Sequence, residues 1–272
     1  MESIVFYCLS ENTMTSRDIE TTSTKGYLNL PDDSTITYHR TYGKPPGVVF
    51  LTGFRSDMQG NKALAVENFC KINDQAFVRF DYFGHGESSG KFEHGSISRW
   101  LEDTITVIDE LTKGPQILVG SSMGGWLMLL AALQRKKRVA GLIGIAAAPD
   151  FTEDLIKPNL SANQLLDVHK LGYCEVPNNY DEVPYIVTKE LLEDGKHHLL
   201  LRSKISLNIP LRLLHGIEDR DVPWQTALRI MEKFGGDDVE IHYSKNSDHS
   251  LSTDRDLKRI FSILERLLKI EN

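Results

Sequence analysis

A serine flanked by two glycines, in the pattern Gly-x-Ser-x-Gly at residues 120–124, provides a candidate nucleophile on a sharp turn. The pattern follows an apolar run at 116–119 and precedes a helix-forming segment at 125–133. A strand-to-helix turn of this kind exposes the serine hydroxyl above a sheet, next to helix N–H groups that favour a developing negative charge. We therefore predict Ser122 as a nucleophile. A glycine-rich loop without chemistry is the competing interpretation.

A serine hydroxyl becomes reactive when a base takes its proton, and the base needs a carboxylate that orients it. On folds with this kind of serine turn, the acid and then the histidine follow the serine along the chain. Of the nine histidines, His242 lies inside an expected strand, whereas His249 lies in the loop that follows it. We predict His249 as the base, with an ordinary helix-capping loop as the alternative. His215 precedes the expected acid and is interpreted as structural.

Three carboxylates follow the expected buried strand at 211–215, namely Glu218, Asp219 and Asp221. Pro223 is expected to start the next helix, because proline is favoured in the first turn. Asp221 then lies close enough to that helix to be its cap. Asp219, just beyond the strand and its glycine turn, is the predicted acid.

The oxyanion that forms during acyl transfer needs N–H donors, and each contributes roughly 3 kcal/mol. The backbone N–H of Met123, directly after the nucleophile, is one predicted donor. The second is the Phe54 N–H, in the loop after the expected strand at 47–52, where Gly53 permits a close approach. Oxyanion loop, nucleophile, acid and base all follow expected strands, so the sequence predicts a serine hydrolase.

Strands alternate with helices along most of the chain, which predicts an α/β fold with a mostly parallel sheet covered on both faces. The expected strands are 26–30, 35–41, 47–52, 76–82, 115–119, 139–146, 211–215 and 239–243. The expected helices are 62–72, 96–112, 125–133, 225–234 and 253–270.

The polar residues 1–24 are expected to form an N-terminal arm, and residues 25–272 a single domain. Residues 149–208 contain helical patches at 163–171 and 188–192 and several prolines, but no expected strand. Because this segment is inserted between two sheet strands, we predict a small helical cap over the carboxyl edge of the sheet, where open α/β sheets bind ligands. A surface insertion without a functional role is the alternative.

Composition excludes several other functions. A net charge of −7 argues against a nucleic-acid partner. The three scattered cysteines, Cys8, Cys70 and Cys174, form neither a disulfide framework nor a metal site. A glycine-rich loop at 84–90 lacks the lysine of a phosphate-binding motif. We expect no cofactor, no metal and a monomer.

No apolar stretch is long enough to span a bilayer; the most apolar, around 126–133 and 139–148, are interpreted as core. The N-terminal residues lack the basic region of a secretory signal and the arginine content of a mitochondrial presequence. The sequence therefore favours a cytoplasmic protein.

The stretches at 61–65, 78–82, 114–129, 209–216, 222–224 and 247–249 resemble the α/β-hydrolase superfamily. Within it they are most similar to the abhydrolase-domain branch of palmitoyl-protein thioesterases and acyl-glucuronide esterases. The resemblance runs from about residue 47 to the last helix and is weaker through the cap. It implies a triad of Ser122, Asp219 and His249, and a mitochondrial location as the alternative to the cytoplasm.

The predicted function is a cofactor-free thioesterase or carboxylesterase that acts through an acyl-enzyme on an acylated protein or a small ester or thioester. The resemblance implies S-palmitoyl proteins and acyl-glucuronides as substrates. An apolar channel beneath the cap would favour a lipidated protein, and a short polar pocket a small ester. An acyltransferase on the same triad is one alternative. A non-catalytic binding module of this fold is another, although such a module would normally lack one triad member.

Overall fold

The computed structural model describes residues 22–177 and 184–270. The predicted N-terminal arm at 1–24 therefore lies outside the described residues except for its last three, of which Thr24 begins the first strand. None of the described helices is long and apolar enough to cross a membrane.

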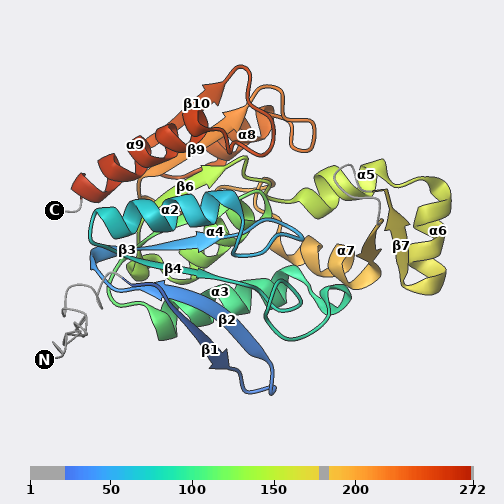
Figure 1. Ribbon diagram of the computed structural model, residues 1–272. Coiled ribbons are helices and arrows are strands. Elements are labelled where there is room, and N and C mark those ends of the chain that lie inside the picture. The colour runs from blue at the N-terminus through green and yellow to red at the C-terminus, as the bar shows by residue number, and fades with distance from the viewer. Residues whose placement is uncertain (1–21, 178–183, 271–272) are drawn as a thin grey trace, which may run out of the picture.

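An eight-stranded sheet forms the centre of the molecule, in the order β1-β2-β4-β3-β5-β6-β9-β10 (Figure 1). The two pairings β1 with β2 and β2 with β4 are antiparallel, and all the others in this sheet are parallel. This arrangement confirms the predicted α/β fold. The strands are β1 (Thr24–Asn29), β2 (Thr35–Thr41), β3 (Lys44–Leu51), β4 (Gln75–Phe80), β5 (Gln116–Ser121), β6 (Val139–Ile145), β9 (Leu211–Gly216) and β10 (Val239–Ser244).

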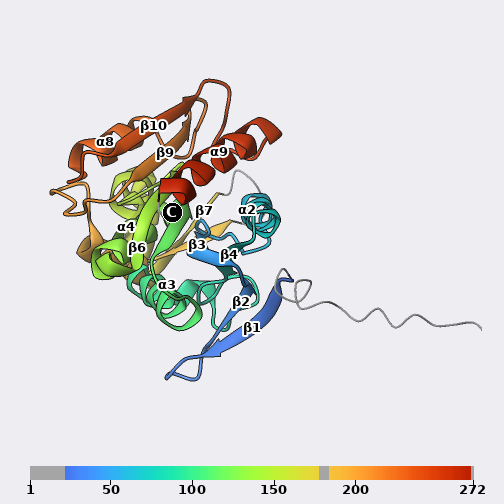
Figure 2. The same ribbon diagram turned by 90° about the vertical axis from the view of Figure 1, so that its left-hand side faces the viewer.

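Helices cover both faces of the sheet (Figure 2). Side chains alternate between the faces along each strand, so in β3 Val48 and Phe50 join one apolar cluster and Val49 and Leu51 the other. Helices α2 (Asn61–Ile72) and α9 (Asp254–Ile270) pack on the first face. The other face holds α3 (Ile97–Leu111), α4 (Met123–Gln134) and α8 (Gln225–Lys233). Short helical turns η1 (Phe92–His94) and η2 (Lys136–Arg138) lie in the connections.

The segment between β6 and β9 lies beside the carboxyl ends of the central strands, as Figure 1 shows. It contains η3 (Thr152–Ile156), α5 (Lys157–Asn159), α6 (Ala162–Leu171), β7 (Tyr173–Val176), β8 (Tyr185–Thr188), α7 (Lys189–Gly195) and η4 (Lys196–His198). We refer to this segment as the cap.

The expectation that the cap contains no strand is wrong, because β7 and β8 form an antiparallel hairpin. Each strand has only four residues, and each buries a single side chain, Cys174 in β7 and Val187 in β8. These two pack with Leu160, Val168 and Leu192 in a small cluster of their own. One buried residue per strand leaves no alternating pattern that a sequence can reveal.

Candidate active site

Ser122 lies between β5 and α4 in a backbone conformation that non-glycine residues rarely adopt, with φ 53° and ψ −118°. Three hydrogen bonds hold this turn. The Ser122 N–H donates to the Ile145 carbonyl (2.9 Å), and the Ser122 carbonyl accepts from the N–H groups of Gly125 (2.9 Å) and Ala148 (3.0 Å). A Cβ atom on Gly124 would overlap the backbone of β3, which explains the second glycine of the motif.

The structure brings Ser122, Asp219 and His249 together from three loops that follow β5, β9 and β10. His249 Nε2 lies 3.1 Å from Ser122 Oγ, and His249 Nδ1 lies 2.8 Å from Asp219 Oδ2. An ionised carboxylate only accepts, so Nδ1 carries the ring proton and Nε2 is free to accept the serine proton. This is the geometry that a serine nucleophile and its base require.

The Asp219 carboxylate is fully buried and surrounded by donors. Its Oδ1 accepts from the backbone N–H groups of Asp221 (2.9 Å) and Val222 (2.8 Å), and its Oδ2 lies 3.1 Å from His215 Nε2 as well as next to His249. Burial by itself raises the pKa of Asp219. The hydrogen bonds from His215 and His249 outweigh burial and hold that pKa below its usual value, so the acid is ionised.

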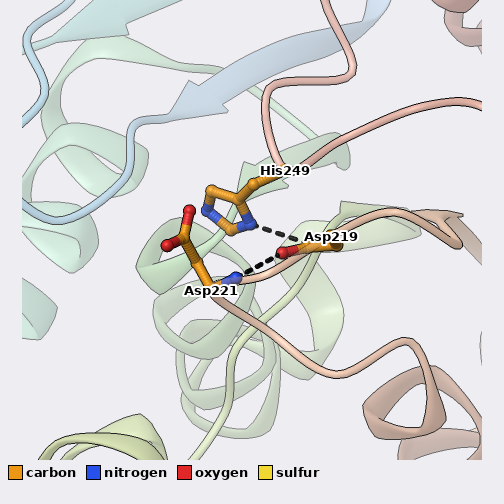
Figure 3. Close-up of side chains that lie close together, drawn as sticks. All are labelled: Asp219, Asp221 and His249. Carbon is orange, nitrogen blue, oxygen red and sulfur yellow. Dashed lines mark hydrogen bonds and ion pairs between the residues drawn. The ribbon is translucent and has the colours of Figure 1, made fainter. Parts of the chain in front are cut away.

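A second carboxylate, that of Asp221, lies beside the imidazole of His249 (Figure 3). One oxygen from each of Asp219 and Asp221 and one ring nitrogen of His249 lie within 4.8 Å of one another. Residues of these types can hold a metal ion. The Asp219 oxygens are occupied by four donors, however, and His249 Nε2 lies beside Ser122 Oγ, so the set is better suited to proton transfer.

Asp221 does not cap the following helix, contrary to the sequence-based expectation. Helix α8 begins at Gln225, with Trp224 at the N-cap position and no side-chain cap. Pro223 lies before the helix, and its carbonyl accepts from the Thr226 N–H (2.8 Å). The side chain of Asp221 instead lines the cavity that contains Ser122.

Phe54 and Met123, the predicted oxyanion donors, line the same cavity as Ser122 and His249. The loop that contains Phe54 passes close to Ser122, since a Cβ atom on Gly53 would lie 3.4 Å from the Ser122 Cβ. Within the described part of the chain, the backbone N–H groups of Phe54 and Met123 have no protein acceptor. Both are therefore available to an oxygen atom bound next to Ser122.

The cavity has a volume of about 690 Å³ and lies between the cap and the carboxyl ends of the strands. The cap contributes an apolar wall formed by Phe151, Leu155, Ile156, Leu160, Val176 and Tyr185. The core contributes three cationic side chains, those of Arg55, Lys62 and Arg220. A cavity in which an apolar wall faces polar and charged groups beside Ser122 is suited to small molecules or acyl chains.

Two histidines that support the site were not predicted as site residues. His215, interpreted as structural, contacts the carboxylate of Asp219. His85 lies in the glycine-rich loop that was considered only for phosphate binding, and its Nε2 accepts from the Arg55 N–H in the oxyanion loop. His85 follows β4 and His215 lies near the end of β9, so both lie at the carboxyl edge of the sheet. That position in the sequence could have indicated that they belong to the site.

Comparisons with known proteins agree with this architecture. A family model described as serine aminopeptidase, S33 matches residues 46–181. Human palmitoyl-protein thioesterase ABHD10, mitochondrial, is 40% identical over 243 residues, which are 89% of this chain and 79% of that protein. The solved structure of mouse alpha/beta hydrolase domain-containing protein 10 has a TM-score of 0.85 and 36% identity, over 92% of this chain and 100% of that one. A putative hydrolase from Agrobacterium vitis has a TM-score of 0.86 and 35% identity, over 91% and 98%.

Proposed function

This chain belongs to the α/β-hydrolases, in the family described as serine aminopeptidase, S33, and from that premise we propose that it is a palmitoyl-protein thioesterase with Ser122 as its nucleophile. The observation that carries the proposal is the relay from Ser122 Oγ through His249 to Asp219, with separations of 3.1 Å and 2.8 Å. The human relative, 40% identical, bears the name of such a thioesterase.

Acylation begins when Ser122 Oγ attacks the thioester carbonyl carbon while His249 Nε2 takes the hydroxyl proton. The buried, ionised Asp219 stabilises the imidazolium that forms. The negative charge on the carbonyl oxygen is stabilised by the N–H groups of Phe54 and Met123. The carbon–sulfur bond then breaks, and the imidazolium gives its proton to the leaving thiolate.

Deacylation repeats these steps with water. His249 removes a proton from a water molecule that attacks the Ser122 acyl ester, and then returns it to Ser122 Oγ as the free acid leaves. No cofactor takes part. An acyltransferase would follow the same first half, and only an acceptor that displaces water would distinguish it.

The cavity supports an acyl substrate with a long apolar chain. Apolar cap side chains, including those of Leu155, Ile156 and Leu160, line the same cavity as Ser122 and offer a surface on which such a chain is removed from water. The cations Arg55, Lys62 and Arg220 in that cavity favour a second candidate substrate, an acyl-glucuronide, whose leaving group carries a carboxylate.

We further infer a mitochondrial rather than a cytoplasmic location, because the relatives of this chain are named as mitochondrial proteins. Imaging of a carboxyl-terminal fluorescent fusion tests this location, and a diffuse cytosolic signal would contradict it.

We also infer that the protein is a monomer. Analytical ultracentrifugation tests this inference, and a dimer would contradict it.

A fluorophosphonate probe tests the nucleophile. We expect labelling of the native chain and of Ser121→Ala, whose altered residue is the neighbouring serine at the end of β5, and no labelling of Ser122→Ala. Undiminished labelling of Ser122→Ala would overturn the proposal. For the substrate, turnover of a palmitoyl-thioester peptide is compared with p-nitrophenyl esters of increasing chain length. A steep loss of rate beyond short chains would exclude the depalmitoylase function.

A further inference from the structure

The oxyanion loop contains a turn over residues 53–56 that is held by two hydrogen bonds. The Ser56 N–H donates to the Gly53 carbonyl (3.1 Å), which belongs to the same peptide plane as the Phe54 N–H. The Arg55 N–H donates to His85 Nε2 (3.3 Å), from a loop 30 residues away. Together these bonds orient the peptide that contains the predicted oxyanion donor and the peptide that follows it.

Arg55, the third residue of this turn, has a φ of 56°. A positive φ at that position is characteristic of type II turns, which favour glycine there, whereas a type I turn has a negative φ and the central peptide rotated by about half a turn. Arginine gains nothing locally from the positive φ. The bond from the Arg55 N–H, which belongs to the central peptide, favours this orientation.

The ring of His85 has only one tautomer that suits both of its partners. Its Nδ1 lies 3.2 Å from the Phe83 carbonyl oxygen, which can only accept, so Nδ1 carries the proton. Its Nε2 faces the Arg55 N–H, which can only donate, so Nε2 carries none. A protonated imidazolium would place two N–H groups against each other.

The surroundings of His85 hold the ring in this orientation. The side chain is buried, with edge-to-face contacts to Tyr82, Phe92 and Trp100 at centroid distances of 5.6, 5.2 and 5.2 Å. Burial lowers the pKa of His85 to about 4, so Nε2 remains an acceptor at neutral pH. The Phe54 ring packs against the same Phe92 and Trp100, so the loop and its histidine share one aromatic cluster.

We propose that His85 is a positioning residue for the oxyanion hole: its neutral, Nδ1-protonated ring holds the Arg55 peptide and thereby fixes the turn that presents the Phe54 N–H next to Ser122. This inference rests on the proposed hydrolase function. A buried histidine that only fills the core would affect stability, whereas a positioning residue affects kcat.

Two variants separate these roles. His85→Phe keeps an aromatic ring but removes the acceptor, and we expect it to lower kcat about 10- to 100-fold with KM changed less than about twofold, since loss of a whole oxyanion donor costs about 100- to 1,000-fold. His85→Gln offers an amide oxygen in place of Nε2, and we expect it to recover most of the lost rate. His94→Phe, at an exposed histidine of η1, serves as the matched control.

The tautomer is read independently from ¹⁵N NMR of the native enzyme with labelled histidine. We expect His85, whose signals are assigned by their loss in His85→Gln, to have a protonated Nδ1 and an unprotonated Nε2, and this tautomer to stay unchanged from neutral pH to about pH 5. An unchanged kcat in a folded His85→Phe variant, or a protonated Nε2 on His85 in the native enzyme, would overturn the proposal. If His85→Phe fails to fold, the NMR result still decides whether His85 Nε2 can accept from the Arg55 N–H. Continued labelling of Ser122→Ala would instead reject the hydrolase function and leave the tautomer result standing.

Discussion

Nε2 of His215 lies 3.1 Å from Oδ2 of Asp219, the same oxygen that accepts from His249. His215 is fully buried at the end of β9, and its N–H is shared with the Val222 carbonyl at 3.0 Å. The Asp219 carboxylate is thus held from the protein interior by His215 while it orients His249 toward Ser122. With the two backbone donors on Oδ1, this arrangement keeps Asp219 charged and fixed although it is removed from water.

Asp219→Asn is therefore expected to reduce kcat strongly. An amide side chain cannot stabilise the imidazolium, and it can hold His249 in the wrong tautomer, for which losses of about 10⁴ in kcat are known in serine hydrolases. Steady-state kinetics on a palmitoyl-thioester peptide provide the measurement, with circular dichroism to establish that the variant is folded. A folded variant with a loss of less than about tenfold would show that Asp219 is not the acid.

Asp221→Asn tests whether the second carboxylate beside His249 contributes to the reaction. A carboxylate oxygen of Asp221 lies within 4.8 Å of a ring nitrogen of His249. Its negative charge stabilises the imidazolium, so we expect removal of that charge to lower kcat about three- to tenfold. Because Asp221 is only half-buried, the difference should shrink as salt is raised to about 1 M. Glu218→Gln, which removes the same charge from an exposed neighbour, is the control. Equal losses in both variants would argue against a specific role for Asp221.

The alternating strands and the order of serine, acid and histidine were enough to predict the sheet and the residues that meet at its edge. Those predictions depend on strand ends, and strand ends are recognisable because the strands of a parallel sheet are continuous apolar runs. Strand ends alone therefore predict that Ser122 and His249, which are 127 residues apart, lie close together.

Other features of the cap and of the site could not be predicted from strand ends, for physical reasons. The role of His85 depends on which ring nitrogen meets an N–H group 30 residues away, and a sequence does not record tautomers. The hairpin of β7 and β8 has too few buried residues to show a period. Asp221 was assigned to a helix cap because Pro223 was expected to start α8, but the helix begins two residues later.

The attachment of the cap to α3 provides a prediction about substrate binding. Asp194 of α7 accepts from the Ser98 N–H (2.8 Å) and the Ser98 hydroxyl (2.5 Å) at the start of α3. Asp194→Ala is expected to lower the free energy of unfolding by about 1–2 kcal/mol, as loss of a helix cap does. It should raise KM more than it lowers kcat, because the cap lines the cavity while the triad belongs to the core. Asp167→Ala, at an exposed position of α6, should change neither quantity.

The low pKa of His85 predicts how its contribution to stability depends on pH. The pKa falls from 6.5 in the unfolded chain to about 4 in the fold, chiefly through burial and further through the charge of Arg55, against the opposing effects of the Phe83 carbonyl and Asp57. Between these values the unfolded state binds more protons than the native state, so stability rises with pH. The contribution is complete above about pH 6.5 and is lost as the pH falls toward 4.

Urea unfolding of the native chain and of His85→Gln at about pH 7.5 and about pH 5 isolates the pH-dependent contribution of His85 to stability, because the other titrating groups are common to both proteins. The difference in unfolding free energy between the two proteins should decrease by on the order of 2 kcal/mol at the lower pH, since only the native chain must keep residue 85 uncharged. Asp103 has its pKa raised to about 6 by burial and favours the fold at low pH, but it does so in both proteins and cancels in the comparison. An unchanged difference between the two pH values would mean that His85 is not held neutral, and the Arg55 N–H would then lack its acceptor.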